Sequence, residues 1–431
     1  MEQVIIIGAG LSGLALANSL EHHGIPYQVF ERGQPTGDQG WSLSLHFGWH
    51  ALKRILSQER AAAMPRQGVA DCSNPFGSSF SIVDLARNKV LMQMPPPEQR
   101  IKGYPDTPPA FEVYRINRKR FRQWLLDGLG EHKVTWHKQL LHYKLLANGG
   151  VEAYFDDGSV VKGAVIVGAD GVHSKVCSQL MGPDRYADAT TTNPVQVIVC
   201  NRWTSADEWL SVQDNMASSV MGYGGKAGIF CTLNDVDHVL HPDKPYQVLC
   251  AVSTLDLDPN DIPSSQQGLL DTAQKIIVDN AYDPANPVVG LVRNASVDQG
   301  DVLTYLTVRE RSPDTQTLTA TDGRVTLIGD AAHTMTMYRG EGGNHAIVDA
   351  VQLGDALSRA YQQEISLVEA VQSYLQEMLP RGATAVQASH EAADLLHRSP
   401  DKLMQIILQQ IERNQAPPNN HGQDGNPPSN L

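Results

Sequence analysis

Three glycines near the start of the chain have the spacing of a dinucleotide-binding loop. Gly8, Gly10 and Gly13 form the pattern GxGxxG, and Glu31 follows 18 residues after the last of them. The first glycine permits a tight turn, the second lets the backbone approach a pyrophosphate, and the third allows a helix to pack closely against a strand. The N–H groups at the start of that helix attract phosphate, and a carboxylate such as Glu31 can accept hydrogen bonds from ribose hydroxyls.

The residues around these glycines predict the elements that must position them. Val4–Ile7 is a short run of β-branched apolar residues, typical of a strand that is buried on both faces. The residues after Gly13 have the pattern of a helix that ends at Gly24, and Tyr27–Phe30 is predicted as a second strand. The glycines therefore lie where a strand turns into a helix within a β-α-β unit, and this context makes the motif specific.

Two further motifs with glycine and aspartate follow predicted buried strands. The sequence GADG occupies residues 168–171 after a strand at 164–167, and GDAAH occupies residues 329–333 after a strand at 324–328. A third segment, GEGGN at residues 340–344, precedes a long run of apolar residues at helical spacing. Glycines at a helix start leave its N–H groups open to an electron-rich group.

The chain between these motifs predicts two kinds of β-structure. Turn residues at 148–150 and 156–158 separate the strands of a small meander that leads back to the main sheet. Between residues 186 and 290, strand-like runs are separated by connections rich in Pro and Asp, which favours an antiparallel sheet over further βα units. The predicted strands are residues 195–200, 228–233 and 247–252; residues 222–225 are interpreted as a turn and residues 267–280 as a helix of the scaffold.

Composition and charge exclude several classes of protein. The chain has 431 residues and a net charge of −13, from 34 basic and 47 acidic residues. A nucleic-acid partner is therefore disfavoured. No stretch reaches about 18 consecutive apolar residues, so no membrane-spanning helix is expected. The five cysteines lie far apart without a CxxC pair, which argues against disulfides and zinc, and no metal is predicted. The start of the chain lacks the pattern of a secretory leader, so we expect a cytoplasmic protein.

A basic segment at residues 112–126 has the apolar spacing of a helix, with Asn117 as its predicted N-cap. It carries four arginines, at positions 115, 118, 120 and 122. From this segment alone, a solvated basic face is favoured over a binding role.

Taken in order, the motifs at 8–13, 168–171 and 329–333 resemble those of the FAD-dependent aromatic-hydroxylase-like (group A) flavoprotein monooxygenases. The resemblance covers roughly residues 1–380. Within the family, the chain looks most like the short, salicylate-hydroxylase-like members from fungi. It implies an α/β fold with a Rossmann-type FAD-binding domain, an inserted and mostly antiparallel β-sheet substrate domain, and C-terminal helices.

The same resemblance sets the expected domain boundaries. The FAD-binding domain is expected to be discontinuous, and the substrate domain to be inserted in two parts. The expected ranges are 1–60, 105–185 and 290–360 for the FAD-binding domain, 61–104 and 186–289 for the substrate domain, 361–412 for a C-terminal helical region and 413–431 for a disordered tail.

The resemblance implies a role for each matching residue. Glu31 is expected to hold the adenosine ribose, Arg118 to approach FAD, and Asp170 to shape the site where FAD meets the nicotinamide cofactor. Asp330 is expected to bind the ribityl chain, and residues 342–344 to place backbone donors near the N1–C2=O edge of the flavin. The full cofactor-binding set predicted in this way is Gly8, Gly10, Gly13, Glu31, Arg32, Arg118, Asp170, Gly329, Asp330, Gly342, Gly343 and Asn344.

Two positions depart from the family pattern. Cys177 stands where the family usually has an arginine after the Asp-Gly motif, so either Lys175 supplies the charge or the contact is absent. The loop after Asp330, which usually carries a proline beside the flavin, here reads MTMYR at residues 335–339. In the family's fold this loop faces the reactive C4a position.

The function implied by the resemblance is that of a monooxygenase that consumes NADPH or NADH. Reduced FAD would react with O2 to give a C4a-hydroperoxide, whose terminal oxygen passes to an electron-rich aromatic or alkene small molecule. Hydroxylation, epoxidation and Baeyer–Villiger insertion all fit this scaffold, and the fungal resemblance suggests a tailoring step in specialised metabolism, on a polyketide or an indole alkaloid. The same FAD motifs also fit an oxidase or a reductase, and a non-enzymatic flavin-binding protein is the least favoured alternative.

Four residues are candidates for contact with the substrate. Arg202 follows the strand predicted at 195–200, in the part expected to roof the substrate, and His46 follows residues expected to pass near the flavin. Tyr338 and Arg339 lie in the loop beside the flavin. For Arg202 and His46, a structural role is the favoured interpretation from the residues alone.

Overall fold

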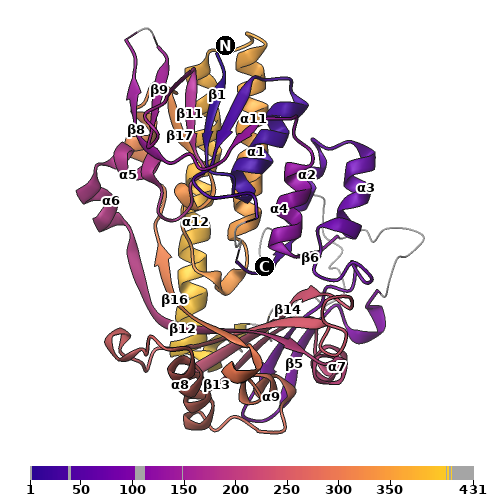
Figure 1. Ribbon diagram of the computed structural model, residues 1–431. Coiled ribbons are helices and arrows are strands. Elements are labelled where there is room, and N and C mark those ends of the chain that lie inside the picture. Colours follow the sequence, from indigo (N-terminus) through magenta and orange to yellow (C-terminus); the bar gives the residue numbers. More distant parts are fainter. Residues whose placement is uncertain are drawn as a thin grey trace, which may run out of the picture.

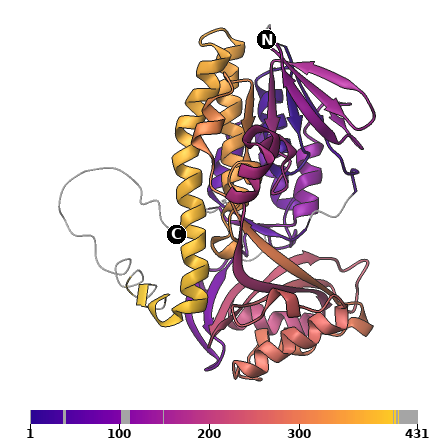
Figure 2. The ribbon, with the colours of Figure 1, turned by 90° about the vertical axis from the view of Figure 1, so that its left-hand side faces the viewer.

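The computed structural model describes residues 2–36, 40–101, 112–147, 149–403, 405–406 and 409. Figure 1 shows two layered bodies, the upper one built on a parallel sheet and the lower one on a larger, mostly antiparallel sheet. The long helix α12 (Leu367–Arg398) runs along both bodies, as Figure 2 shows from the side. Among the helices described, none combines the length and apolar character needed to cross a membrane. The predicted α/β fold is confirmed.

The upper body contains a five-stranded sheet in which all neighbouring strands are parallel. Its order is β17 (Val325–Leu327), β11 (Val165–Gly168), β1 (Val4–Ile7), β2 (Tyr27–Phe30) and β7 (Val134–Thr135). The central strands are buried along their whole length, as their β-branched apolar residues predict. Helices α1 (Leu11–His22) and α11 (Gly342–Tyr361) pack against each other beside this sheet.

Two small sheets complete the upper body. The predicted meander is confirmed as an antiparallel sheet of β8 (Leu140–Leu145), β9 (Val151–Phe155) and β10 (Val160–Gly163). Asn148, in the first of its predicted turns, lies outside the described residues. A two-stranded antiparallel ribbon is formed by β3 (Leu43–Leu45) and β6 (Tyr114–Ile116).

The lower body is a seven-stranded sheet in which β13 (Ser219–Gly224) and β4 (Phe80–Asp84) pair in parallel, and all other neighbouring strands are antiparallel. Its order is β16 (Val302–Glu310), β12 (Thr191–Thr204), β15 (Tyr246–Thr254), β14 (Ala227–Val236), β13, β4 and β5 (Lys89–Met94). The predicted antiparallel sheet is therefore confirmed. Helices α7 (Ala206–Asn215), α8 (Gln266–Asp279) and α9 (Pro287–Arg293) cover the face of this sheet that points away from the upper body.

Shorter helices connect these elements. The α-helices are α2 (Phe47–Lys53), α3 (Gln58–Gln67), α4 (Arg118–Leu126), α5 (Lys175–Met181), α6 (Pro183–Ala189) and α10 (Thr315–Thr319). The 3-10 helices are η1 (Pro97–Gln99), η2 (Pro259–Asp261), η3 (Val297–Gln299), η4 (Gly329–Ala331) and η5 (Met337–Arg339). Asn117 caps α4 as predicted, because its Oδ1 accepts a hydrogen bond of 3.0 Å from the Arg120 N–H.

The interpretation of residues 222–225 as a turn was wrong for three of the four residues. Gly222 and Gly224 lie in strand β13, and only Gly225, with φ of +61°, follows it. A Cβ at Gly222 would lie 2.6 Å from Leu85 Cδ2, and one at Gly224 would lie 2.9 Å from Tyr282 Cε1. These glycines therefore serve close side-chain packing in the strand and not chain reversal.

The sheets divide the chain differently from the predicted domain ranges at two places. Strand β16 falls within the range expected for the FAD-binding domain, but it pairs with β12 in the seven-stranded sheet. Helix α3 falls largely within the range expected for the substrate domain, but it packs against α4 of the upper body. The predicted tail at 413–431 lies outside the described residues.

Alternation along β12 decides which side chains face the upper body. Ile198 and Cys200 belong to the apolar core shared with the covering helices, whereas Val197 and Val199 pack on the opposite face with residues of η5. Arg202 shares the parity of Ile198 and Cys200. It is 4 % exposed and lies on the side of the covering helices, with ion pairs to Glu208 at 3.0 Å and to Asp301 at 3.3 Å.

We expect Arg202→Ala to lower the free energy of unfolding by about 3–5 kcal/mol, because it leaves the buried Asp301 carboxylate without its cation. Arg359→Ala is the matched control: Arg359 and its partner Glu364 are both more than half exposed, and the expected loss is below about 0.5 kcal/mol. Urea unfolding of both variants measures the difference. Equal losses in the two variants would contradict the buried placement of Arg202.

Candidate functional site

The motifs singled out in the sequence meet at one edge of the parallel sheet. The glycine loop follows β1, Glu31 follows β2, the GADG motif follows β11 and the GDAAH motif follows β17. Hydrogen bonds join the neighbouring strand ends: Gly8 N–H to Phe30 O at 2.8 Å and Ala169 N–H to Ile7 O at 2.8 Å. The carboxyl edge of a parallel sheet is the usual ligand position in such folds.

The glycine loop is shaped for close approach of a ligand to the backbone. Gly8 has φ of +110°, and a Cβ there would lie 2.4 Å from Ala169 O. A Cβ on Gly13 would lie 2.0 Å from Gly8 O, so helix and strand pack together only because both residues are glycine. At Gly10, in contrast, no atom lies within 4 Å of a Cβ position, and α1 begins there without a side-chain cap. The open space and the helix start fit a pyrophosphate.

Glu31 and Arg122 hold this loop in place. The Glu31 carboxylate accepts hydrogen bonds of 2.7 Å from the N–H groups of both Ala9 and Gly33. Arg122 donates from Nε to Ala9 O at 2.8 Å and from Nη1 to Pro35 O at 2.7 Å. The sequence analysis assigned Arg122 to a solvated basic face; it is 3 % exposed, and the only signal was its place on the apolar stripe beside Phe121.

The two other predicted basic candidates lie at the periphery of this region. Arg32 is exposed. Arg118 is half-buried at the first position of α4, and its Nη1 lies 3.7 Å from the position that a Cβ of Gly40 would take. Arg32 therefore lies in the segment that directly follows β2, and Arg118 lies beside Gly40.

The Asp-Gly motif braces the start of helix α5. Asp170 accepts a hydrogen bond of 2.5 Å from the Ser174 hydroxyl and one of 2.6 Å from the Lys175 N–H. Burial raises the pKa of the Asp170 carboxyl, and these hydrogen bonds act against the rise. The Lys175 side chain is exposed, so it does not fill the place of the arginine expected after this motif.

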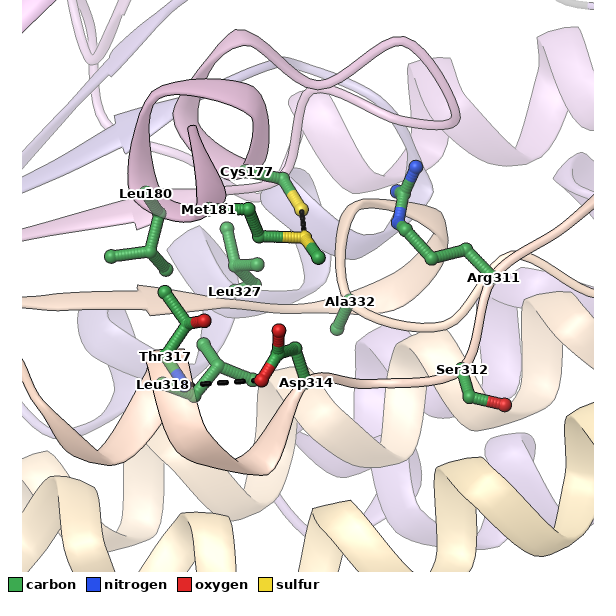
Figure 3. A pocket seen from close by; sticks show the side chains of 10 residues that line it. All are labelled: Cys177, Leu180, Met181, Arg311, Ser312, Asp314, Thr317, Leu318, Leu327 and Ala332. Atoms are coloured by element: carbon green, nitrogen blue, oxygen red, sulfur yellow. Dashed lines mark hydrogen bonds between the residues drawn. The ribbon is translucent and has the colours of Figure 1, made fainter. Parts of the chain in front are cut away.

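A buried guanidinium does lie between the two aspartate motifs, but it comes from Arg311, directly after β16. Arg311 is 2 % exposed and donates to Asp330 O at 2.9 Å, to Ala331 O at 3.1 Å and to Thr190 Oγ1 at 3.0 Å. Figure 3 shows its side chain at one end of a small pocket, which Cys177 also lines. No sequence motif marks Arg311, because its partners are brought to it only by the fold.

The side chain of Asp330 is exposed at η4, while its backbone is held from both sides. Arg311 binds its carbonyl, and Asp349 on α11 accepts a hydrogen bond of 2.7 Å from the N–H of the preceding Gly329. Asp330 can therefore offer its carboxylate to a ligand from a fixed backbone.

The start of α11 has no side-chain cap, which leaves the first N–H groups of the helix open. Asn344 is fully buried and uses its side chain elsewhere: its Oδ1 accepts from His46 N–H at 2.9 Å, and its Nδ2 donates to Ser44 O at 2.9 Å. The Asn344 N–H donates to Glu341 O at 2.9 Å, so the backbone donors of Gly342 and Gly343 are the ones that, together with the positive end of the helix dipole, fit an electron-rich ligand edge.

Three of the four catalytic candidates lie near this helix start. Arg339 forms an ion pair with Glu341 through two hydrogen bonds, of 2.9 and 3.0 Å. Burial lowers the pKa of His46, and Glu341 acts against this effect. The Tyr338 hydroxyl is buried without a hydrogen-bond partner among the described residues. Arg202 is not brought to this group, because it lies on the other face of the seven-stranded sheet.

An apolar wall faces the loop at 335–339. It is formed by one face of the seven-stranded sheet, and Met337 and Tyr338 of η5 pack against it. Its buried members are Val195, Val197, Val199, Leu249, Ala251 and Val308, with Trp41, Phe230, Leu255 and Leu306 partly buried beside them. Such a surface excludes water and suits an apolar ligand.

Comparison with known proteins also points to FAD as the ligand of this fold. The family model of the FAD binding domain matches residues 304–389. The FAD-dependent monooxygenase vrtH of Penicillium aethiopicum is 30% identical over 409 residues, covering 92% of each chain. The FAD-dependent monooxygenase thnD of Trichoderma harzianum is 28% identical over 408 residues, covering 91% of this chain and 93% of its own.

Solved structures share the fold. A putative FAD-containing monooxygenase from Photorhabdus luminescens superposes with a TM-score of 0.73 at 24% identity, over 92% of this chain and 99% of its own. HpxO of Klebsiella pneumoniae, complexed with FAD and uric acid, superposes with a TM-score of 0.68 at 19% identity, over 96% and 93%.

We expect Glu31→Ala to weaken FAD binding by about 1–3 kcal/mol, because the carboxylate no longer braces the glycine loop or accepts from ribose. Titration of the FAD-free protein with FAD, followed by flavin fluorescence, measures the affinity. Glu21→Ala is the control: Glu21 is exposed on α1 and accepts a hydrogen bond of 2.8 Å from the Tyr27 hydroxyl, away from the loop. Equal affinities in both variants would contradict the role of Glu31.

A second prediction concerns pH. Although burial alone would raise it, the pKa of Glu341 is held at about 2 by His345 and Arg339. A depressed pKa stabilises the fold above the unfolded value near 4.5, and this contribution is lost as the pH falls from about 4.5 towards 2. The loss of unfolding free energy in Glu341→Gln, about 2–3 kcal/mol at pH 7, should therefore shrink below about pH 4.5. Chemical unfolding at several pH values tests this, with the exposed Glu364→Gln as control; a constant difference would contradict it.

Proposed function

The chain belongs to the group A, aromatic-hydroxylase-like flavoprotein monooxygenases, and we propose that it inserts one oxygen atom from O2 into an electron-rich aromatic or alkene small molecule. It is an FAD-dependent monooxygenase enzyme. NADPH or NADH serves as its electron donor in this proposal, and the reaction is a tailoring step in specialised metabolism, on a polyketide or an indole alkaloid.

One observation carries the proposal: two uncapped helix starts, those of α1 and α11, flank the same carboxyl edge of the parallel sheet. The first fits a pyrophosphate and the second an electron-rich ring edge. Their combination suits a dinucleotide with a redox-active ring, and FAD, when bound, supplies the transfer of electrons and the activation of O2.

The protein residues then have distinct tasks in holding FAD. In this proposal Glu31 binds the adenosine ribose, the glycine loop and the start of α1 bind the pyrophosphate, and Asp330 binds the ribityl chain. The N–H groups of Gly342 and Gly343 face the pyrimidine edge of the flavin, where they stabilise the negative charge that reduction brings, and Asn344 holds this helix start through its side chain. Arg118 completes the site from α4.

The apolar wall supplies the place for the substrate. Val197 and Val199 are fully buried or nearly so, and Phe230 lies beside them, opposite the loop that carries Met337 and Tyr338. In this proposal a planar hydrophobic substrate lies against this wall, whose apolar side chains exclude water and protect the reactive oxygen species from hydrolysis. HpxO of Klebsiella pneumoniae, which shares this fold, was solved in complex with uric acid, a small cyclic compound.

A basic group lies behind this wall. Arg115 is 8 % exposed, its guanidinium carbon lies 5.9 Å from the ring of Phe230, and it donates to Ser42 O at 2.9 Å. Burial lowers the pKa of Arg115 to about 9. At neutral pH it therefore remains charged and contributes positive potential to the substrate side.

We expect Asp330→Ala to lose most of its bound flavin, because the ribityl chain loses its acidic partner. The purified protein should lack the flavin absorbance that the wild type carries. Asp322→Ala is the control, since Asp322 is 79% exposed in the turn before β17 and pairs only with Arg324 among the described residues. Full flavin content in Asp330→Ala would contradict the placement of the ribityl chain.

Oxygen transfer itself is tested with isotopically labelled O2. The wild-type protein is supplied with NADPH or NADH, a panel of aromatic and alkene compounds, and 18O2, and the products are analysed by mass spectrometry. Incorporation of one labelled atom is the expected result. Consumption of the nicotinamide cofactor with release of hydrogen peroxide and without labelled product, across the panel, would favour an oxidase; a reduced product without oxygen would favour a reductase.

A further inference from the structure

Helix α12 carries a charged residue on its buried stripe, at a position outside the predicted cofactor-binding set. Arg381 follows the buried Tyr374 and Met378 along this stripe and precedes Ala385, and its side chain is 19% exposed. An arginine at such a position must find partners, because an unpaired buried charge is costly. Its guanidinium contacts three partner side chains: Glu377, Asp349 and His345.

The first partner of Arg381 is a surface one. Glu377, one turn earlier on the same helix, accepts from Nε at 2.7 Å and from Nη2 at 2.9 Å. Its side chain is 42% exposed, so this pair orients the guanidinium without burying a second charge. The other two partners lie on α11.

The second partner is Asp349, which is fully buried and accepts from Arg381 Nη2 at 2.8 Å. Its other oxygen accepts from the Gly329 N–H and from His333 Nε2, both at 2.7 Å. Burial would raise the pKa of Asp349, but His333 and Arg381 hold it at about 2. Asp349 is thus a carboxylate whose three donors include the backbone directly before Asp330.

The third partner is His345, in the first turns of α11. Arg381 Nη1 lies 3.0 Å from His345 Nδ1, and because arginine only donates, Nδ1 must accept. In the neutral ring, the proton is therefore on Nε2, which lies 3.9 Å from Glu341 Oε2. Glu341 in turn holds Arg339 at the end of the loop at 335–339.

We propose that Arg381 is a positioning residue for the flavin, which fixes the Gly329–Asp330 segment through Asp349 and the start of α11 through His345. In the proposed placement these two segments reach FAD from different sides of the site, and α11 links them because Asp349 accepts from the Gly329 N–H. The guanidinium connects them from a third helix. This role rests on the placement of FAD proposed above.

The planar fork of arginine is required for this arrangement. Its donors point toward Asp349 and His345 at once while Nε stays with Glu377. A lysine ammonium is a compact charge on a flexible stem and cannot span both acceptors in fixed directions. Replacement by methionine keeps the volume and apolar stem but removes every donor, so Asp349 retains only His333 and Gly329 N–H.

The test compares Arg381→Met and Arg381→Lys in the full-length chain. We expect the dissociation constant of FAD to rise at least about tenfold in Arg381→Met and several-fold in Arg381→Lys, as befits lost hydrogen bonds between charged groups. Tyr374→Phe is the matched control: Tyr374 is on the same helix and its buried hydroxyl donates to Leu327 O at 2.9 Å, outside the charge network. Tyr374→Phe should lower the melting temperature and leave the FAD dissociation constant within about twofold of the wild type.

A second readout separates positioning from a general loss of stability. In FAD-saturated Arg381→Met the midpoint potential of the bound flavin should fall, because the backbone donors of α11 are no longer held against its edge; in Tyr374→Phe it should stay at the wild-type value. The dissociation constant of FAD in the double variant Arg381→Met/Asp349→Asn should lie within about twofold of that in the single variant that binds FAD more weakly, because both changes break the same connection.

A wild-type FAD dissociation constant in Arg381→Lys or in folded Arg381→Met would overturn the proposal, as would an equal weakening in Tyr374→Phe. Additive losses in the double variant would overturn the route through Asp349. The Asp330→Ala variant distinguishes this failure from that of the flavin placement. If Asp330→Ala loses FAD while Arg381→Met keeps it, the role of Arg381 is wrong; if Asp330→Ala keeps FAD, the placement itself is wrong.

Discussion

The parallel pairing of five short strands is the constraint on which the rest of the site depends. Because β1, β2, β11 and β17 all point the same way, the segments that follow them emerge at one edge and pack against one another. Direct hydrogen bonds between strand ends leave little freedom: Ala169 N–H binds Ile7 O, and Ile328 N–H binds Gly168 O. Motifs separated by more than 300 residues in the chain thereby form one surface.

Buried charges fix the parts of this surface that the strands alone do not. The Gly329–Ala331 turn is held by opposite charges on its two sides, the Asp349 carboxylate on an N–H group and the Arg311 guanidinium on two carbonyls. The turn follows β17 of the upper body. Because Arg311 directly follows β16 of the lower sheet, its hydrogen bonds anchor the turn to the lower body as well. A displacement of the seven-stranded sheet would therefore reach this turn through Arg311, whose N–H also donates to Thr334 O at 2.9 Å.

Residue types and spacing predicted the elements whose role is local. The strand at Val4–Ile7 and the glycines after it could be predicted because a tight turn and a close approach admit few alternatives to glycine. The same reasoning failed at Gly222 and Gly224, where glycine makes room for Leu85 and Tyr282; the absence of a side chain does not show whether the chain turns or a neighbour packs closely.

Long-range partners are the part that the sequence could not supply. No motif distinguishes Arg311 and Arg381 from the other arginines in the chain. Arg311 binds groups between 19 and 139 residues away, and Arg381 binds Asp349 and His345, which are 32 and 36 residues away. A sequence signal did exist for Arg381 and Asp349, since each is a charge on the apolar stripe of its helix. It indicates that a buried partner must exist but does not identify it.

Strand alternation in the lower sheet divides its residues between stability and selectivity. Ile198, Cys200 and Arg202 pack with the covering helices, and their neighbours Val197 and Val199 face the loop beside the flavin site. The charged Arg202 thus lies on the face that packs with the covering helices, and the valines lie on the face that the proposed function assigns to the substrate. Because these valines offer shape and no hydrogen bonds, selectivity on this wall must come from the volume and outline of the substrate and not from its polar groups.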